Sequence, residues 1–222
     1  MRDINLITNA VMRSKLIQSG ISSLARLHKL SDDYIHKACQ AIRKQGGIPA
    51  TKEITMRQEE TLDQLVRWSK HRYLIQRTLV YAEPSLDNIE LISDWMIQHK
   101  EDTGDPPEVE KFSDSLKKRE WLESIQGFLS QTLGAAGLPI AYVVRTNSPL
   151  PADDAGPGQP TLDEELLVRG RHTAHFWASN NRKLWHLLYK VCHNTTAWTL
   201  IAPFARTMNG RAAHRAIVRQ YM

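Results

Sequence analysis

The sequence has few cysteines and no long apolar run. Its two cysteines, Cys39 and Cys192, both fall within apolar helical patterns, where a free thiol behaves as a small hydrophobic side chain. No stretch of the 222 residues approaches the roughly 18 consecutive apolar residues that a membrane span needs. The N-terminal segment lacks the apolar core and small-residue cleavage site of a secretory signal. We therefore expect a reduced, cytoplasmic protein with no membrane partner.

Motifs that mark catalysis or cofactor binding are missing as well. The chain contains no G-x-S-x-G sequence, and the Gly-Ala-Ala-Gly segment 134–137 lacks the Lys-Ser/Thr that completes a phosphate-binding loop. Asp102-Thr103-Gly104 has the letters of an aspartic protease triad, but no apolar strand precedes it. The nine histidines include His172-x-x-His175, yet no Cys or His pairs have the spacing of a zinc site. We expect a protein that is not an enzyme and that takes no metal, cofactor or small-molecule substrate.

Acidic residues are absent from residues 169–222, which carry nine lysines and arginines. Residues 1–80 hold 14 basic and 7 acidic residues, whereas residues 81–168 hold 6 basic and 17 acidic residues. Two basic ends therefore flank an acidic middle. Clustered cations favour nucleic-acid binding, because a phosphate backbone that they neutralise releases its counterions. The alternative is that the basic and acidic segments face each other, within the fold or between subunits.

Residues 1–47 form a first helical section. A helix ends at Gly20, a short helix follows, and Ser31 is placed to cap a third helix that stops at Gly46-Gly47. This section resembles SAM-like and helix-hairpin-helix modules, which bind DNA backbones or associate with themselves. A DNA-binding hairpin would aim the backbone amides near Gly20 at a phosphate. The alternative is that Gly20 only terminates a helix.

Residues 48–57 are a linker, and residues 58–145 are expected to form a core of long amphipathic helices. The first of these, over 58–80, has an exposed side with Arg67, Lys70, His71 and Arg77. Two more helices follow, one after Ser85 and one over about 113–133. Each helix carries one tryptophan, and we expect the three to share one core: Trp68, Trp95 and Trp121.

A short β-hairpin is predicted at the end of this core. Residues 137–145 alternate as a strand does, and residues 166–168 are the available partner. Between them, residues 146–165 are rich in Pro and Gly and predict a loop.

Residues 166–222 predict a basic unit of three short helices. They lie over about 180–191, around Trp198 until Pro203, and after a turn at Asn209-Gly210. Trp185 and Trp198 are expected in its core. The fold class is therefore mainly α, with a small N-terminal bundle, long amphipathic helices, one possible hairpin and this C-terminal unit.

The order and spacing of several short motifs resemble the capsid-like Gag region of LTR retrotransposons, nearest to Copia-type elements of diatoms and related protists. The resemblance covers most of the chain. This sequence departs from the family at Asn209, where an acidic residue usually precedes the Gly-Arg pair. The motifs are Gly46-Gly47, Arg77, the segment 137–145, Asn181 before an apolar helix, Thr196-Ala197-Trp198 with Ile201, and Gly210-Arg211-Ala212-Ala213 leading to Tyr221.

The resemblance implies a non-enzymatic structural protein that assembles with itself and packages the element's single-stranded RNA. Because the chain stops directly after a helix, it would be a fragment of a longer polyprotein. The alternative function is a DNA-binding or regulatory module, in which the N-terminal bundle contacts DNA and the remainder dimerises. The basic residues expected to face phosphate are Arg182, Lys183, Arg206, Arg211, Arg215 and Arg219.

Overall fold

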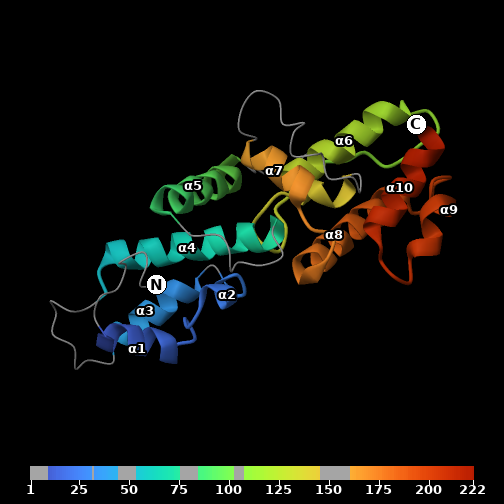
Figure 1. Cartoon of the computed structure of the whole chain (residues 1–222). Helices are drawn as coiled ribbons and strands as arrows, with labels where there is room; N and C mark the ends of the chain where they lie inside the picture. The colour runs from blue at the N-terminus through green and yellow to red at the C-terminus, as the bar shows by residue number, and fades with distance from the viewer. Residues whose placement is uncertain (1–9, 32, 45–53, 76–84, 103–107, 146–160) are drawn as a thin grey trace. The chain divides into compact units, whose positions relative to one another are not determined.

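The structure is a computed structural model that describes residues 10–31, 33–44, 54–75, 85–102, 108–145 and 161–222 (Figure 1). Over these ranges it consists of helices and turns, without a strand, so the prediction of a mainly α fold is confirmed. None of the helices in these ranges combines the length and the apolar character that crossing a membrane requires.

The chain divides into two compact units, residues 1–96 and residues 97–222. This division falls inside the region 58–145 that the sequence assigned to one helical core. Trp68 and Trp95 belong to the first unit and Trp121 to the second, so the three tryptophans do not share one compact core. Of these residues, Trp68 and Trp121 are buried and Trp95 is half-buried.

The first unit is built around α4 (Met56–Ile75), against which α2 (Leu24–Leu27) and α3 (Tyr34–Lys44) pack; α1 (Ala10–Gln18) packs on α3 (Figure 1). The first part of α5 (Leu86–Asp102) also belongs to this unit. Apolar residues at helical spacing explain why these helices form and pack. On α3 the buried stripe is the predicted one: Ile35, Ala38, Cys39 and Ile42.

Gly20 ends α1. Its φ of +88° lies in the left-handed region that glycine adopts without strain. The backbone N–H groups of Ser19, Gly20 and Ile21 donate to the carbonyls of Lys15, Ile17 and Leu16, respectively. These amides are therefore engaged by α1 itself, as at an ordinary helix C-terminus, and do not form an open phosphate site.

On α4, the predicted exposed basic side is wrong in part. Lys70 and His71 are buried, with 5% and 0% of their surface exposed. Arg67 is half-buried, pairs with Asp63 and donates from Nη1 to Ser93 Oγ at 2.9 Å. Arg77 lies outside the described residues. Of the predicted 48–57 linker, Met56 and Arg57 already belong to α4.

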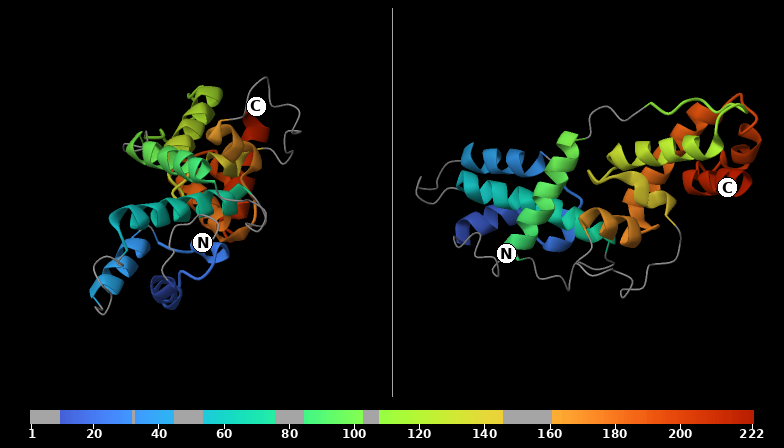
Figure 2. Two further views of the ribbon diagram at one scale, coloured as in Figure 1. Left: turned by 60° about the vertical axis from the view of Figure 1, so that its left-hand side comes forward. Right: turned by 90° about the horizontal axis from the view of Figure 1, so that it is seen from above.

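In the second unit, α8 (Ala174–Cys192) and α10 (Gly210–Tyr221) pack against each other, and α9 (Trp198–Ile201) packs on both (Figure 2). The 3₁₀ helix η5 (Ala202–Phe204) continues α9 through Pro203. The 3₁₀ helix η3 (Ile140–Val144) contacts α8, α10, α6 (Lys118–Gln131) and α7 (Leu162–Arg169). The three predicted C-terminal helices are therefore present, although α8 begins about six residues earlier than its periodicity indicated.

The predicted β-hairpin is wrong. Its first strand is the 3₁₀ helix η3, whose residues 140–143 are all buried, so their alternation did not mark one solvated face. Its second strand lies within α7, which begins at a capping box: Thr161 Oγ1 accepts from Glu164 N, and Glu164 Oε2 accepts from Thr161 N. The end of the predicted loop, residues 162–165, therefore belongs to this helix, and residues 146–160 lie outside the described residues.

Candidate nucleic-acid interface

The start of α10 is fixed against α8 by a glycine. A Cβ atom on Gly210 would lie 2.5 Å from both the Asn181 carbonyl oxygen and the Trp185 backbone nitrogen. Only glycine permits this approach of the two helices. Gly210 is thus the first residue of α10 rather than part of the predicted turn, and Asn209 caps the helix by accepting from Ala212 N at 3.1 Å.

A second amide from α8 completes this helix start. Asn181 is buried, its Oδ1 accepts from Arg211 N at 2.7 Å, and its Nδ2 donates to Asn209 Oδ1 at 3.2 Å. The N–H groups of Arg211 and Ala212 in the first turn of α10 are therefore satisfied by side chains. As a result, the position of Arg211 relative to α8 is set by glycine packing and by two asparagines.

Backbone carbonyls bring basic residues from three segments together. Arg145 Nε donates to Gly170 O at 3.0 Å, and Arg211 Nη2 donates to Arg145 O at 2.8 Å. His172 Nε2 lies 2.9 Å from Tyr142 O, which requires that this nitrogen carry the proton. Arg215 lies one helical turn after Arg211 on α10. We call this group, Arg145, His172, Arg211 and Arg215, the arginine cluster.

The pKa values show that the members of the arginine cluster affect one another. Burial lowers the pKa of the Arg211 guanidinium, and the charges of Arg215 and Arg145 lower it further. Burial also lowers the pKa of His172 to about 4, and all three arginines contribute to that decrease. At neutral pH the imidazole is therefore uncharged while the guanidiniums stay positive. Three cations in a half-buried setting create a positive potential that favours an anion.

The other four predicted basic residues are exposed. Lys183 donates from Nζ to Leu133 O at 2.9 Å. Arg182 lies on α8, Arg206 in the turn that leads to α10, and Arg219 near the end of α10. The structure therefore brings together two of the six predicted residues, Arg211 and Arg215.

Arg145 and His172 are members that the sequence did not identify. The sequence pattern predicts Arg145 in a strand, and it relates His172 only to the spacing of metal ligands. Arg145 is hydrogen-bonded to Gly170 and Arg211, which lie 25 and 66 positions away in the sequence. No local sequence pattern predicts contacts over such separations. The one available signal was general: basic residues in a region without carboxylates.

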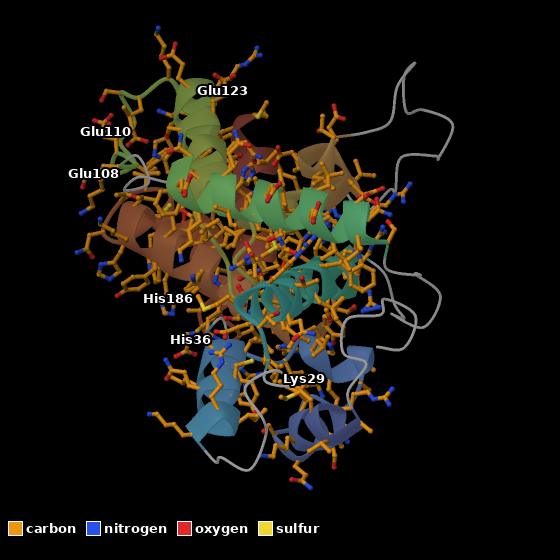
Figure 3. The ribbon with its side chains drawn as sticks, turned by 90° about the vertical axis from the view of Figure 1, so that its left-hand side faces the viewer. Lys29, His36, Glu108, Glu110, Glu123 and His186 are labelled. Atoms are coloured by element: carbon orange, nitrogen blue, oxygen red, sulfur yellow. The ribbon has the colours of Figure 1, made fainter. Side chains whose placement is uncertain are left out.

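The first unit contains a different polar group, which joins α3 to α4. Glu59 Oε1 lies 2.6 Å from His36 Nδ1, and Glu59 Oε2 accepts from Arg43 at 2.5 Å; Figure 3 shows His36 on α3. Burial raises the pKa of Glu59, but these hydrogen bonds outweigh it and the pKa is lowered. Burial and the Glu59 charge raise the pKa of Cys39 to about 11, so this thiol is a poor nucleophile. The arrangement serves packing between two helices.

Within the described residues, no three His, Cys, Asp or Glu side chains gather closely enough to hold a metal ion. Both cysteines are free and buried, as the sequence predicted, and burial raises the pKa of Cys192 to about 12. The arginine cluster is therefore the most distinctive concentration of polar groups in the part of the chain that is described. Comparison of the chain with protein-family models, curated proteins and solved structures finds no match.

Proposed function

We propose that the chain is a non-enzymatic structural protein that binds RNA through its second unit and assembles with copies of itself, as its resemblance to capsid-like Gag proteins implies. The observation that carries this proposal is the arginine cluster. It gathers three guanidiniums from two segments and the imidazole of His172 from a third, and residues 169–222 contain no acidic residue.

Phosphate is the anion that suits this cluster. A guanidinium presents up to five N–H donors in a planar fork that matches the oxygens of a phosphate. Arg145 and Arg211 are held by backbone carbonyls, so their side chains lose little further freedom on binding. Among the described residues, no hydrogen bond or ion pair holds the guanidinium of Arg215. Arg215 is therefore the member best placed to turn toward a phosphodiester.

The exposed face of α5 supports self-assembly. Leu86, Leu91 and Ile97 are 49%, 59% and 38% exposed on this helix. Exposed acidic residues surround them, and such a mixed apolar and acidic surface complements a basic surface on another copy. These acidic residues are Asp87, Glu90, Asp94 and Glu101.

The RNA part of the proposal is tested by the salt dependence of binding to single-stranded RNA. Each phosphate contact that is lost should reduce the slope of log K against log salt by about 0.7. We expect Arg215→Gln to weaken binding and to reduce the slope by that amount. The matched control is Arg119→Gln, which removes an exposed cation of α6 that pairs with Glu123. Equal slopes for the wild-type chain and Arg215→Gln would contradict the role of the cluster.

The assembly part is tested by light scattering over a range of protein and salt concentrations, with and without single-stranded RNA. The expected result is growth into large assemblies that RNA promotes and high salt dissolves. A monomer or dimer that ignores RNA would contradict assembly. A discrete footprint on duplex DNA would instead favour the DNA-binding module. The backbone amides around Gly20 donate to carbonyls of α1, so they do not support DNA binding by the first unit.

A further inference from the structure

Aromatic rings from α8 and α9 gather at one end of the second unit. Trp185 and Tyr189, four residues apart, lie on one side of α8, and His193 is the residue that directly follows this helix. Trp198 of α9 contacts all three, with ring centroids 6.4, 5.5 and 5.3 Å away. Tyr189 and His193 stack on each other at 4.7 Å. We call the outer three rings, Tyr189, His193 and Trp198, the ring platform.

The ring platform lies at the surface. Trp185, beneath it, is only 3% exposed, as in a core. His193 and Trp198 are half-buried, and Tyr189 is 42% exposed. Exposure therefore increases from Trp185 in the core to Tyr189 at the surface, along one set of rings that contact one another. Trp198, predicted as a core residue, therefore lies at the border between core and solvent.

Cations flank these rings. The cations are Arg182, two turns before Tyr189, and Lys190, directly after it; His186, a neutral polar side chain, lies one turn before Tyr189, and all three are exposed. Figure 3 places His186 on α8, and Glu108, which approaches Lys190 Nζ to 3.9 Å, on the segment that precedes α6. Aromatic rings beside cations are the combination by which proteins hold single-stranded nucleic acid, since the bases stack and the phosphates meet positive charge.

An open groove of about 500 Å³ adjoins the chain between His193 and Trp198. Its carboxylate, Asp114, accepts a hydrogen bond from Thr196 at 2.9 Å. A carboxylate repels phosphate but accepts hydrogen bonds from the amino groups of bases. This end of the unit therefore suits bases better than backbone. The groove is lined by Phe112, Ser113, Asp114, Asn194, Thr195 and Thr196.

We propose that the ring platform stacks the unpaired bases of single-stranded nucleic acid. This inference rests on the proposed RNA binding and deepens it, because it assigns base contacts to a surface separate from the arginine cluster. Bases in a duplex already stack on one another and do not offer their faces. The ring platform consequently selects single strands over duplexes, and it tolerates any base because every base has a π-face.

The test compares two oligomers with the same number of phosphates, a uridine oligomer and an abasic oligomer. Stacking on aromatic side chains contributes about 1–3 kcal/mol per base, so the wild-type chain should prefer the uridine oligomer by about 5- to 150-fold. Binding to the uridine oligomer, and not to the abasic one, should also quench tryptophan emission through Trp198. Tyr189→Leu should remove most of the preference, and Tyr189→Phe should keep it. Ile17→Ala, which removes exposed apolar surface from α1, should leave the preference unchanged.

Each outcome separates this inference from the function on which it rests. If the wild-type chain binds both oligomers equally, RNA binding stands and the base-stacking role is overturned. If it binds neither oligomer, the proposed function itself fails. If Tyr189→Leu leaves the preference intact, or impairs self-association without changing it, the rings serve packing or protein contacts and the inference is overturned.

Discussion

Each of the two units buries a polar helical side chain completely, yet the two side chains differ in their partners. In the second unit, Asn180 donates from Nδ2 to Tyr142 Oη at 2.8 Å and accepts from Ala135 N at 2.8 Å. In the first unit, neither ring nitrogen of His71 has a hydrogen-bond partner, and its ring meets Trp95 edge-on at 5.5 Å. A paired polar group fixes the elements that it joins, whereas an unpaired one only costs desolvation.

The pairing in the second unit leads to the candidate site. The Tyr142 hydroxyl accepts a hydrogen bond from Asn180, and the Tyr142 carbonyl accepts one from His172. One residue thus links α8 to the arginine cluster. Asn181 likewise links α8 to the arginine cluster, because its side chain accepts a hydrogen bond from the Arg211 N–H at the start of α10. No such sequence of contacts surrounds His71 among the described residues. The comparison teaches that the buried Asn180 and Asn181 position a surface in the second unit, whereas the buried His71 weakens a core in the first.

The largest expected effect comes from removing the paired amide. Asn180→Ala leaves the Tyr142 hydroxyl and the Ala135 N–H without partners, and each such group costs about 1–3 kcal/mol. We expect the second unit to lose about 2–6 kcal/mol of its free energy of unfolding. Each unit contains one buried cysteine, so denaturant-dependent thiol labelling reports them separately. Cys192 should become reactive at a lower denaturant concentration, and Cys39 should not change.

Tyr142→Phe is the matched control for this prediction, because it removes one of the two hydrogen bonds and keeps the ring. Its effect on Cys192 labelling should be roughly half as large or smaller. A neutral Asn180→Ala would show that water or neighbouring groups satisfy both partners, and the contrast with His71 would then fail.

The second effect concerns packing rather than polarity. Gly210→Ala places a methyl group 2.5 Å from two backbone atoms of α8, and backbone cannot turn aside as a flexible side chain can. We expect about 1–3 kcal/mol of destabilisation in the second unit, with weaker RNA binding because Arg211 and Arg215 move with α10. Circular dichroism and Cys192 labelling measure the first effect, and the salt slope measures the second.

Gly127→Ala is the control for Gly210→Ala. A Cβ at Gly127, within α6, meets nothing within 4 Å, so the higher helix propensity of alanine should stabilise α6 by up to about 1 kcal/mol. Opposite signs for the two glycine substitutions are expected. If both stabilise, α10 has room to shift, and the close approach does not fix the arginine cluster.

Local patterns in the sequence predicted the helices but not their partners. The stripe on α3 from Ile35 to Ile42 is buried as expected, because periodic apolar residues define one face. Asn181 was interpreted as preceding a helix, although it lies within α8 and is buried there. An asparagine inside a helix is disfavoured locally, and only its distant partners, Asn209 and Arg211, explain its position.

The errors around η3 and α4 have the same physical origin. A short run of apolar residues such as 140–144 is compatible with a strand or with a buried helical turn. Here tertiary packing stabilises the 3₁₀ helix. On α4, periodicity predicted one solvated face, but Lys70 and His71 are covered. Burial on every side of a helix depends on what surrounds it, which one sequence does not specify.

The smallest effect is expected at the unpaired histidine. His71→Phe removes two buried nitrogens that lack partners and keeps a ring against Trp95, so we expect the first unit to gain about 1 kcal/mol at neutral pH. Cys39 labelling should require more denaturant than in the wild-type chain. Cys192 labelling serves as the internal control and should not change.

The pH dependence of the same variant provides a sharper test. Burial, aided by the Arg72 charge, lowers the pKa of His71 from 6.5 to about 4. Between these values the unfolded chain binds a proton that the folded unit does not, so wild-type stability falls as the pH decreases from 6.5. The carboxylate of Glu59, whose pKa is lowered from 4.5, affects stability from about pH 4.5 downward, in the lowest part of this window and below it.

His71→Phe should therefore flatten the pH dependence of Cys39 labelling down to about pH 5. Labelling of Cys192 should still respond in the variant, because burial lowers the pKa of both His172 and His214 to about 4 in the second unit. Parallel pH curves for Cys39 in the wild-type and variant chains would mean that His71 gains a partner in solution. Its burial would then resemble that of Asn180, and the difference between the two units would disappear.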